Sequence, residues 1–323
     1  MRAVVCPELG PLDALVVEDR PDPVPGEGQV VVEVRAAGVN FVDGLICQGR
    51  YQIKPPVPFV PGSEIAGEVV ALGDGVTGVT PGDRVIAFTG FGGFAERVVV
   101  PALSLVPVPD SPESGTAAAL LQSYCTMLFT LTRRTSLAPG EWVLVLGAGG
   151  GIGLAATDVA TALGGRVIAV ASTAAKREAA VAMGAVATID YESEDLKVRA
   201  RQISDGGVDL VIDPVGGGHS EHGLRATRQG GRFCVLGFAS GAIPSLPLNQ
   251  VLLNNRTVVG VDWGGWTFAD PSGNRHLIGE LMDMVAAGRL HPTRPTPYRL
   301  EEAAAVMAGL LDRSVGGKAV VVP

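Results

Sequence analysis

A short apolar strand that runs into a glycine-rich turn is the feature that most constrains how this chain can fold. Residues 143–153 read VLVLGAGGGIG, and an apolar helical pattern follows them. Glycine lets the backbone turn sharply and approach a pyrophosphate, and free N–H groups at a helix start stabilise that anion. Gly147, Gly150 and Gly153 have the G-x-x-G-x-x-G spacing. With a strand before it and a helix after it, this turn predicts a bound dinucleotide, and the alternative is a glycine-rich loop in another kind of α/β domain.

Length and composition indicate a globular chain with a large core. The chain has 323 residues, 47% hydrophobic and 18% charged, which is typical of about two domains. The net charge of −8 argues against nucleic acid as the main partner, since phosphate binding requires a basic face. The sequence has no long apolar run and no signal-peptide pattern, so we expect no membrane span and a cytoplasmic protein. The four cysteines form no C-x-x-C pair and are expected to be free thiols.

The pattern of strands and helices changes near residue 113. Before it, strand-like runs separated by Gly/Pro turns predict a small barrel or sandwich. After it, strands alternate with helices up to residue 256, which predicts a parallel, doubly wound sheet. We expect early strands at 30–34, 65–70 and 84–88, a helix over 114–132, and later strands at 142–146, 166–171, 187–189, 208–212 and 231–236. A mixed segment closes the chain, with helices at 276–287 and 301–311 and a strand at 318–322.

The end of the second parallel strand indicates which dinucleotide binds. NAD-binding folds carry an Asp or Glu there, which holds the ribose 2′-OH. This chain has Ser172 and Thr173, followed by Lys176 and Arg177. Hydroxyl donors and a cation suit a 2′-phosphate, so we expect NADPH rather than NADH. The alternatives are that Lys176 is an ordinary solvated lysine and Ser172 a simple helix cap.

Several motifs in order resemble one family. The chain is similar to the zeta-crystallin-like, zinc-free quinone oxidoreductases of the medium-chain dehydrogenase/reductase superfamily over nearly its whole length. The motifs, beside the glycine turn, are AGVNFVD at 37–43, QGRY at 48–51, PGSEIAGEV at 61–69, GDRV at 82–85 and DPVGG at 213–217. The resemblance implies an α/β protein with a GroES-like β-barrel catalytic domain (1–113), a Rossmann-type NADPH-binding domain (114–256) and a C-terminal return to the catalytic domain (257–323).

The same resemblance predicts that no metal is bound. Zinc-dependent relatives carry Cys where this chain has Asn40 and His where it has Ser63, and amide and hydroxyl groups are poor zinc ligands. The four-cysteine lobe that often follows in those relatives is absent from this sequence. His219 and His222 have a spacing that could suggest two ligands, but the family places them at a loop-to-helix turn without a third, so we expect no site there.

The resemblance also implies how NADPH is held. Its adenine-side phosphate would contact Ser172, Thr173, Lys176 and Tyr191, and its pyrophosphate Gly150, Gly151 and Ile152. The nicotinamide would lie near Thr126 and Phe238. Together with Gly147 and Gly153, these residues form the expected cofactor site.

Without zinc there is no strong Lewis acid, so the expected reaction is hydride transfer to an activated acceptor such as a quinone. The protein then aligns the acceptor and donates a hydrogen bond to the developing oxyanion. The family positions imply that Asn40 and Tyr51 are these donors, and the alternatives are a turn cap for Asn40 and a rim aromatic for Tyr51. Asp43 is expected to order its loop rather than to transfer protons.

Two segments depart from the family pattern around the acceptor. Residues 125–128 read CTML where relatives often have Gly-Thr-Ala-Tyr, and 262–264 lacks a frequent tyrosine. The alternatives to a quinone reductase are therefore a 2-enoyl or enone reductase on the same scaffold and an NADPH-binding protein with little catalysis. The resemblance further implies a homodimer, for which the apolar segments 231–247 and 258–261 could supply edge pairing.

Overall fold

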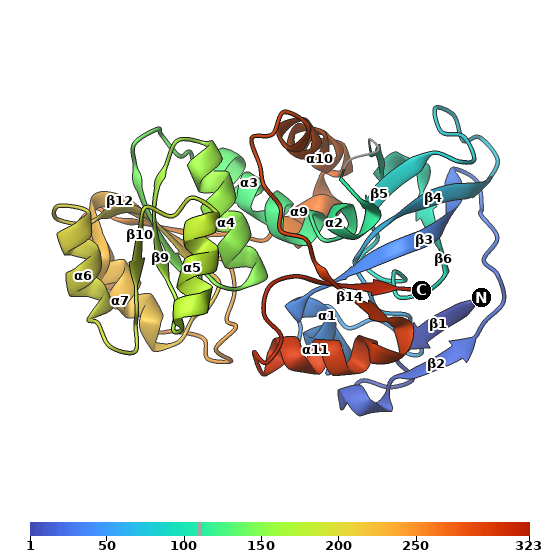
Figure 1. Ribbon diagram of the computed structural model, residues 1–323, viewed down its shortest axis with the longest axis horizontal. Helices are drawn as coiled ribbons and strands as arrows, with labels where there is room; N and C mark the ends of the chain where they lie inside the picture. The colour runs from blue at the N-terminus through green and yellow to red at the C-terminus, as the bar shows by residue number, and fades with distance from the viewer. Residues whose placement is uncertain (109–111) are drawn as a thin grey trace. The chain divides into compact units, whose positions relative to one another are not determined.

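The computed structural model describes residues 1–108 and 112–323, which form two compact units (Figure 1). The first unit contains residues 1–122, 269–286 and 293–323, and the second contains residues 123–268 and 287–292. The chain leaves the first unit after Gln122, builds most of the second, and returns. The domain boundaries given above, after residues 113 and 256, stay predictions.

The first unit is built on a seven-stranded, mainly antiparallel sheet. β3 (Gln29–Val39) is its central strand and pairs with β4 (Glu64–Leu72), with β6 (Arg97–Pro101) and with β15 (Ala319–Val322). The other elements of this unit are β1 (Arg2–Val5), β2 (Val16–Asp19), β5 (Arg84–Phe88), β7 (Leu105–Pro107), β14 (Thr296–Arg299), α1 (Phe41–Cys47), α2 (Ser114–Ala118), α10 (Pro271–Ala286) and α11 (Ala303–Leu311). The predicted strands at 30–34, 65–70 and 84–88 all lie in this sheet.

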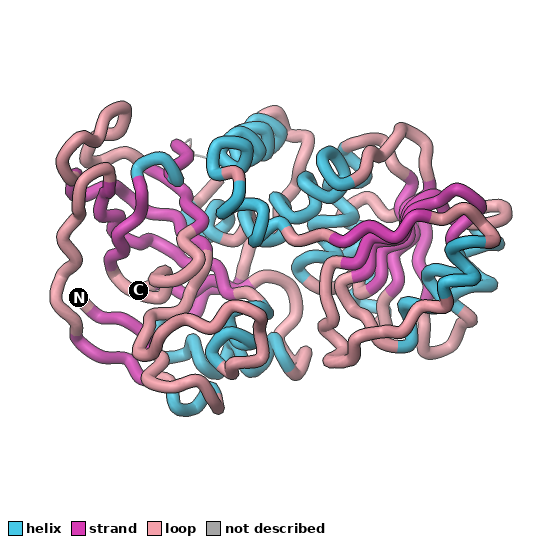
Figure 2. The backbone as a smooth tube through the Cα atoms, turned by 180° about the vertical axis from the view of Figure 1, so that it is seen from behind, coloured by secondary structure: helices cyan, strands magenta, loops and turns pink. Residues whose placement is uncertain are grey.

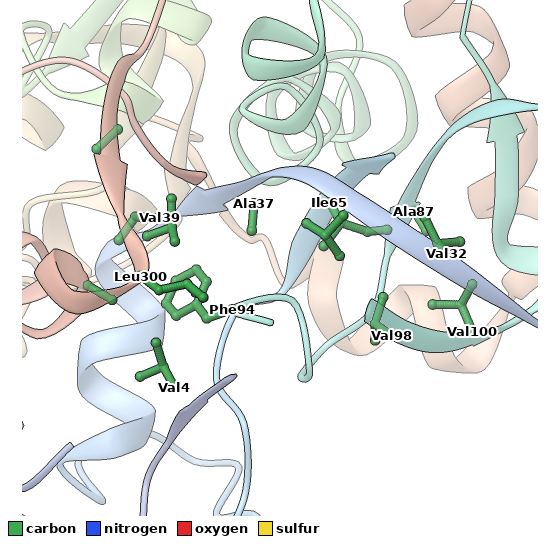
Figure 3. Packing of buried hydrophobic residues seen from close by; sticks show 14 of the residues in the cluster. Val4, Val32, Ala37, Val39, Ile65, Ala87, Phe94, Val98, Val100 and Leu300 are labelled. Atoms are coloured by element: carbon green, nitrogen blue, oxygen red, sulfur yellow. The ribbon is translucent and has the colours of Figure 1, made fainter. Parts of the chain in front are cut away.

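Valine-rich strands supply the core of the first unit. Three side chains are fully buried together: Val32 of β3, Ile65 of β4, and Phe94 of the loop between β5 and β6 (Figure 3). Val4 of β1 and Leu300, just before α11, close the same cluster. β-branched side chains pack well on a pleated surface, which explains why these runs form strands. The last segment of the chain thus completes a core that the first hundred residues begin.

The second unit contains a six-stranded sheet in which every pairing is parallel. Its strand order is β10-β9-β8-β11-β12-β13, so the order reverses between β8 and β11. Figure 2 shows these strands as one twisted magenta band. Their bounds are β8 Trp142–Leu146, β9 Arg166–Val170, β10 Ala187–Ile189, β11 Val208–Asp213, β12 Thr227–Val235 and β13 Thr257–Gly260. The expected α/β class with a doubly wound parallel sheet is confirmed.

Helices cover both faces of the parallel sheet. α4 (Gly151–Ala162) and α5 (Ala174–Ala182) lie on one side, and α6 (Leu196–Ile203) and α7 (Gly218–Ala226) lie on the other (Figure 1). This arrangement follows from right-handed crossovers that change sides when the strand order reverses. Two short helices, α8 (Leu248–Leu252) and α9 (Trp263–Ala269), complete the unit. No helix in residues 1–108 and 112–323 is long and apolar enough to span a membrane.

The continuous helix expected over 114–132 is wrong in detail. The segment is broken into α2, a π-helical stretch at Leu121–Cys125, α3 (Thr126–Phe129) and a second π-helical stretch at Thr130–Arg134. The Gln122 N–H donates to the Glu64 carboxylate at 2.8 Å. The Thr130 hydroxyl donates to the Thr126 carbonyl oxygen, a contact that bends helices. The contact with Glu64 is tertiary and the one at Thr130 depends on a side-chain rotamer, so periodicity alone did not predict the breaks.

Candidate active site

The glycine turn between β8 and α4 has the geometry that a phosphate requires. Gly147 has φ +64°, a conformation that residues with a Cβ rarely adopt. A Cβ on Gly153 would lie 2.3 Å from the Gly147 carbonyl oxygen, so the turn folds tightly over the helix start. Gly150 is the N-cap, and α4 begins with Gly151 and Ile152. The first N–H groups of a helix have no intrahelical partner and carry positive potential, so this turn fits a pyrophosphate.

The loop after β11 lies against the glycine turn, where the strand order reverses. A Cβ on Gly147 would be 2.7 Å from Val215 Cγ2. The Asp213 carboxylate fixes this loop, because it accepts hydrogen bonds from the Val215 and Gly216 N–H groups at 2.9 Å. Phe238 packs beside Gly216 and is partly exposed. Ligands of open parallel sheets bind at such reversals, at the carboxyl ends of the strands.

The segment after β9 contains two basic side chains, Lys176 and Arg177, which lie in different surroundings. Thr173 is the N-cap of α5, and its hydroxyl accepts the Lys176 N–H at 3.3 Å. The Lys176 stem crosses the glycine turn, since a Cβ on Gly149 would lie 2.5 Å from Lys176 Cβ. Arg177 instead donates to the Ala171 carbonyl oxygen at 3.0 Å and pairs with Asp190. Within the described residues only Lys176 of these two cations lacks an ion-pair partner. The helix cap is Thr173 and not Ser172, which precedes it and is partly buried.

Tyr191 and Thr126 complete the predicted cofactor residues, and both lie in the second unit. The Tyr191 ring faces that of His219, with centroids 4.6 Å apart. Thr126 is buried at the start of α3. The described residues contain no group of three or more His, Cys, Asp or Glu side chains placed to hold a metal ion.

The first unit contains a buried polar cluster around Asn40, between β3 and α1. Asn40 Nδ2 donates to Glu64 Oε1 at 2.8 Å, and Asn40 Oδ1 accepts from Lys318 Nζ at 2.8 Å. Lys318 Nζ also lies 3.2 Å from Glu64 Oε1. The second Glu64 oxygen accepts the Gln122 N–H at 2.8 Å. The Asn40 amide is therefore held at both ends.

Strand register explains why these residues meet. β15 pairs with β3 so that Ala319 is opposite Val39, which places Lys318 beside Asn40. β4 pairs with β3 on the other side, with Glu64 opposite Gly38. A Cβ on Gly38 would lie 2.3 Å from Glu64 Oε1, so only glycine leaves room for this carboxylate. Asn40, Glu64 and Lys318 therefore meet because they lie at neighbouring ends of β3, β4 and β15.

Asp43 orders the start of α1 and has an altered acidity. Its Oδ2 accepts the Asn40 backbone N–H at 2.8 Å. Burial raises the pKa of Asp43 to about 7, and the charge of Glu64 acts in the same direction. The Asn40 N–H, the Ser63 hydroxyl and the Lys318 charge lower this pKa in part. The Ser63 hydroxyl is buried near Asp43 without forming a well-aligned hydrogen bond.

Tyr51, the other predicted donor, lies in the turn after α1, in the same unit as Asn40, and is partly exposed. Sequence reasoning missed Glu64 and Lys318. A carboxylate within the apolar run EIAGEVV was a usable signal for Glu64. Lys318 lies 278 residues from Asn40 in the sequence, and nothing local marks it.

Known proteins match this chain along its whole length. Residues 26–110 match the alcohol dehydrogenase GroES-like domain family, and residues 151–283 match the zinc-binding dehydrogenase family. A quinone oxidoreductase-like protein 2 homolog from Nematostella vectensis is 39% identical over 324 residues, which cover 99% of this chain and 88% of that protein. Among solved structures, a mycobacterial protein complexed with NADPH has a TM-score of 0.93 at 31% identity. Escherichia coli quinone oxidoreductase complexed with NADPH has a TM-score of 0.92 at 28% identity, and both alignments cover 100% of each chain.

Proposed function

This chain belongs to the quinone oxidoreductase branch of the medium-chain dehydrogenase/reductase superfamily, and from that premise we propose that it transfers a hydride from NADPH to a quinone without a metal ion. The family, the GroES-like domain and the parallel sheet make it an oxidoreductase of the NADP(H)-binding fold. The observation that carries the proposal is the Asn40 amide, held in one orientation inside a buried polar cluster.

NADPH is the proposed cofactor. The tight turn from Gly147 to Gly153 suits a pyrophosphate, and Lys176 is a cation without an ion-pair partner in the described residues. The mycobacterial and Escherichia coli neighbours were solved with NADPH. The proposed cofactor residues are Thr126, Gly147, Gly150, Gly151, Ile152, Gly153, Ser172, Thr173, Lys176, Tyr191 and Phe238.

The donor set around Asn40 supports independence from zinc. An amide and the Ser63 hydroxyl are poor ligands beside a thiolate or an imidazole. The Lys318 ammonium also lies within 3.2 Å of Glu64, so a positive charge already neutralises the carboxylate that a metal cation would need. Stoichiometric zinc in the purified protein would contradict this part of the proposal.

NADPH, when bound, supplies the hydride, and the chain's own residues are proposed to stabilise the charge that develops on the acceptor oxygen. The Asn40 amide has two N–H groups, of which one donates to Glu64. The second is the proposed donor to the oxyanion, and the Tyr51 hydroxyl is the proposed second donor. A donor that is fixed in place before the reaction does not have to reorganise as the oxyanion forms. This preorganisation is the usual source of oxyanion stabilisation in enzymes.

The test is NADPH oxidation with 1,4-benzoquinone, beside parallel reactions with NADH, with a chelator and with a small enone. Fast turnover that is selective for NADPH and insensitive to the chelator is the expected result. Turnover with the enone alone would support the enone reductase alternative. NADPH binding without turnover on either acceptor would favour a non-catalytic protein.

A homodimer formed along β13 is also proposed. β13 is the last strand in the sheet order and pairs with β12. Edge strands present N–H and C=O groups that a second copy can pair. Val258 on this strand and Leu252 of the nearby α8 are exposed apolar side chains. Sedimentation equilibrium is expected to give a dimer, and a clean monomer at micromolar concentration would contradict it.

A further inference from the structure

We propose that Lys318 is a positioning residue, which acts with Glu64 to fix the Asn40 amide so that its N–H groups point to Glu64 and to the acceptor. This inference rests on the proposed function, because it assigns Asn40 as the hydrogen-bond donor. Lys318 would touch neither NADPH nor the acceptor. Its effect on the reaction would pass through Asn40.

The side-chain amide of Asn40 can lie in either of two orientations. Oδ1 and Nδ2 of an asparagine have nearly the same shape, so packing alone does not distinguish the two orientations. In one orientation Asn40 offers a donor where in the other it offers an acceptor, and only a donor stabilises an oxyanion. The neighbours of Asn40 must therefore select between the two orientations of its amide.

The two neighbours of the Asn40 amide, Lys318 and Glu64, differ in their hydrogen-bonding chemistry. An ammonium group donates hydrogen bonds and accepts none, whereas an ionised carboxylate accepts and does not donate. Lys318 Nζ, 2.8 Å from Asn40 Oδ1, therefore selects the oxygen, and Glu64 Oε1, 2.8 Å from Nδ2, selects the nitrogen. The reversed amide would place donor against donor and acceptor against acceptor.

The Lys318 and Glu64 side chains are both buried, which strengthens their selection of the Asn40 orientation. The Glu64 side chain is 0% exposed and that of Lys318 is 9% exposed. A buried charge without a partner is strongly unfavourable, so the loss of either ion of this pair destabilises the arrangement of the cluster. The Gln122 N–H holds the second Glu64 oxygen and keeps this carboxylate in place.

The test compares Lys318→Met with Lys318→Arg, in the wild-type chain and in an Asn40→Ala background. Lys197→Met, which removes an exposed lysine from α6, is the matched control. We expect Lys318→Met to lower kcat with benzoquinone about tenfold to a hundredfold, since a single oxyanion donor is worth that much or more. The KM for NADPH is expected to stay unchanged, and Lys318→Arg, which keeps the charge, is expected to restore most of the rate.

The double variant separates positioning from a merely structural role. If Lys318 acts through Asn40, Lys318→Met has little further effect on kcat once Asn40 is alanine. The proposal is overturned if Lys318→Met lowers kcat by the same factor in both backgrounds, or if it leaves the wild-type rate within about twofold. Lys318→Met/Glu64→Gln removes both charges together and is the fallback if the single variant does not fold.

A second readout does not depend on turnover. Asn40 is one of five asparagines, so its side-chain amide signals can be assigned with ¹⁵N-asparagine labelling as those missing from Asn40→Ala. We expect Lys318→Met to shift or broaden these signals and Lys197→Met to leave them unchanged. Unchanged Asn40 signals in Lys318→Met would overturn the inference. If the signals change but the wild-type chain reduces no acceptor, the positioning holds and the proposed function fails.

Discussion

The glycine turn of the second unit and the Asn40 cluster of the first are the two candidate sites of this protein, and they are assembled in different ways. The turn is one continuous stretch, and its shape comes from small residues at fixed spacing. The cluster joins Asn40, Glu64 and Lys318 from three strands that are far apart in the sequence. A contiguous site can be recognised from its motif, whereas a site made by strand register becomes visible only in the folded chain.

The largest expected effect comes from breaking the contiguous site. In Gly153→Ala the new Cβ would lie 2.3 Å from the Gly147 carbonyl oxygen and 2.5 Å from Ala148 Cα, both of them rigid backbone atoms. We expect the turn to open and NADPH affinity to fall by about a hundredfold or more. Fluorescence titration with NADPH measures this. Gly279→Ala in α10, where a Cβ meets nothing within 4 Å, is the matched control and should bind normally.

A change in the Asn40 cluster, which strand register assembles, should affect catalysis but not cofactor binding. In Gly38→Ala the new Cβ would meet Glu64 Oε1 at 2.3 Å and the Ala118 carbonyl oxygen at 2.6 Å. We expect a loss of stability of about 1–3 kcal/mol from overpacking and a clear fall in kcat, with NADPH affinity kept. Urea unfolding and steady-state kinetics measure these. Gly115→Ala, whose Cβ would make only ordinary contacts, is the control, and equal losses in both variants would argue against a special role for Gly38.

A smaller effect concerns the choice between the two dinucleotides. Lys176→Ala removes the cation that lies over the glycine turn and leaves the Thr173 cap in place. A charge-assisted hydrogen bond is worth about 1.5–3 kcal/mol, so NADPH affinity should fall about tenfold to a hundredfold while NADH affinity stays nearly unchanged. Titration with both nucleotides measures this selectivity, with Lys197→Ala as the control. An equal loss for NADPH and NADH would mean that Lys176 does not contact the 2′-phosphate.

A separate effect, on folding stability alone and not on cofactor binding or catalysis, is a pH dependence from Asp43. Because its pKa rises from 3.8 to about 7 on folding, the native state holds this proton over a range where the unfolded state has lost it. The free energy of unfolding should therefore fall as the pH rises from about 4 to 7, by at most about 1.4 kcal/mol per pH unit. The charges of Glu64 and Lys318 act on the same group in opposite directions.

Asp43→Asn should remove this contribution, because an amide oxygen can still accept the Asn40 N–H without carrying a charge. The variant is expected to gain stability relative to the wild type between pH 4.5 and 7.5, as measured by urea unfolding at both values. A pH slope identical to that of the wild type would show that Asp43 does not titrate in this range.

The parallel sheet was largely predictable because its signals are local. The strand predicted at 142–146 is β8, and the helix predicted to follow the glycine turn is α4. The helix predicted over 114–132 was less accurate, because the Gln122 N–H bonds to Glu64 across the fold. The family resemblance predicted a role for Asn40, which stays a prediction, but it did not predict the hydrogen-bond partners Glu64 and Lys318.

The sequence by itself determined the elements whose causes lie within a few residues: the apolar strand β8 and the glycines of the turn that follows it. Tertiary structure alone decided where Lys318 goes and hence how Asn40 is oriented. The physical reason is that a turn or a cap is set by backbone geometry and neighbouring hydrogen bonds, whereas the meeting of Lys318, Asn40 and Glu64 depends on strand register. That register is set by the packing of the whole sheet, which no short stretch of the sequence encodes.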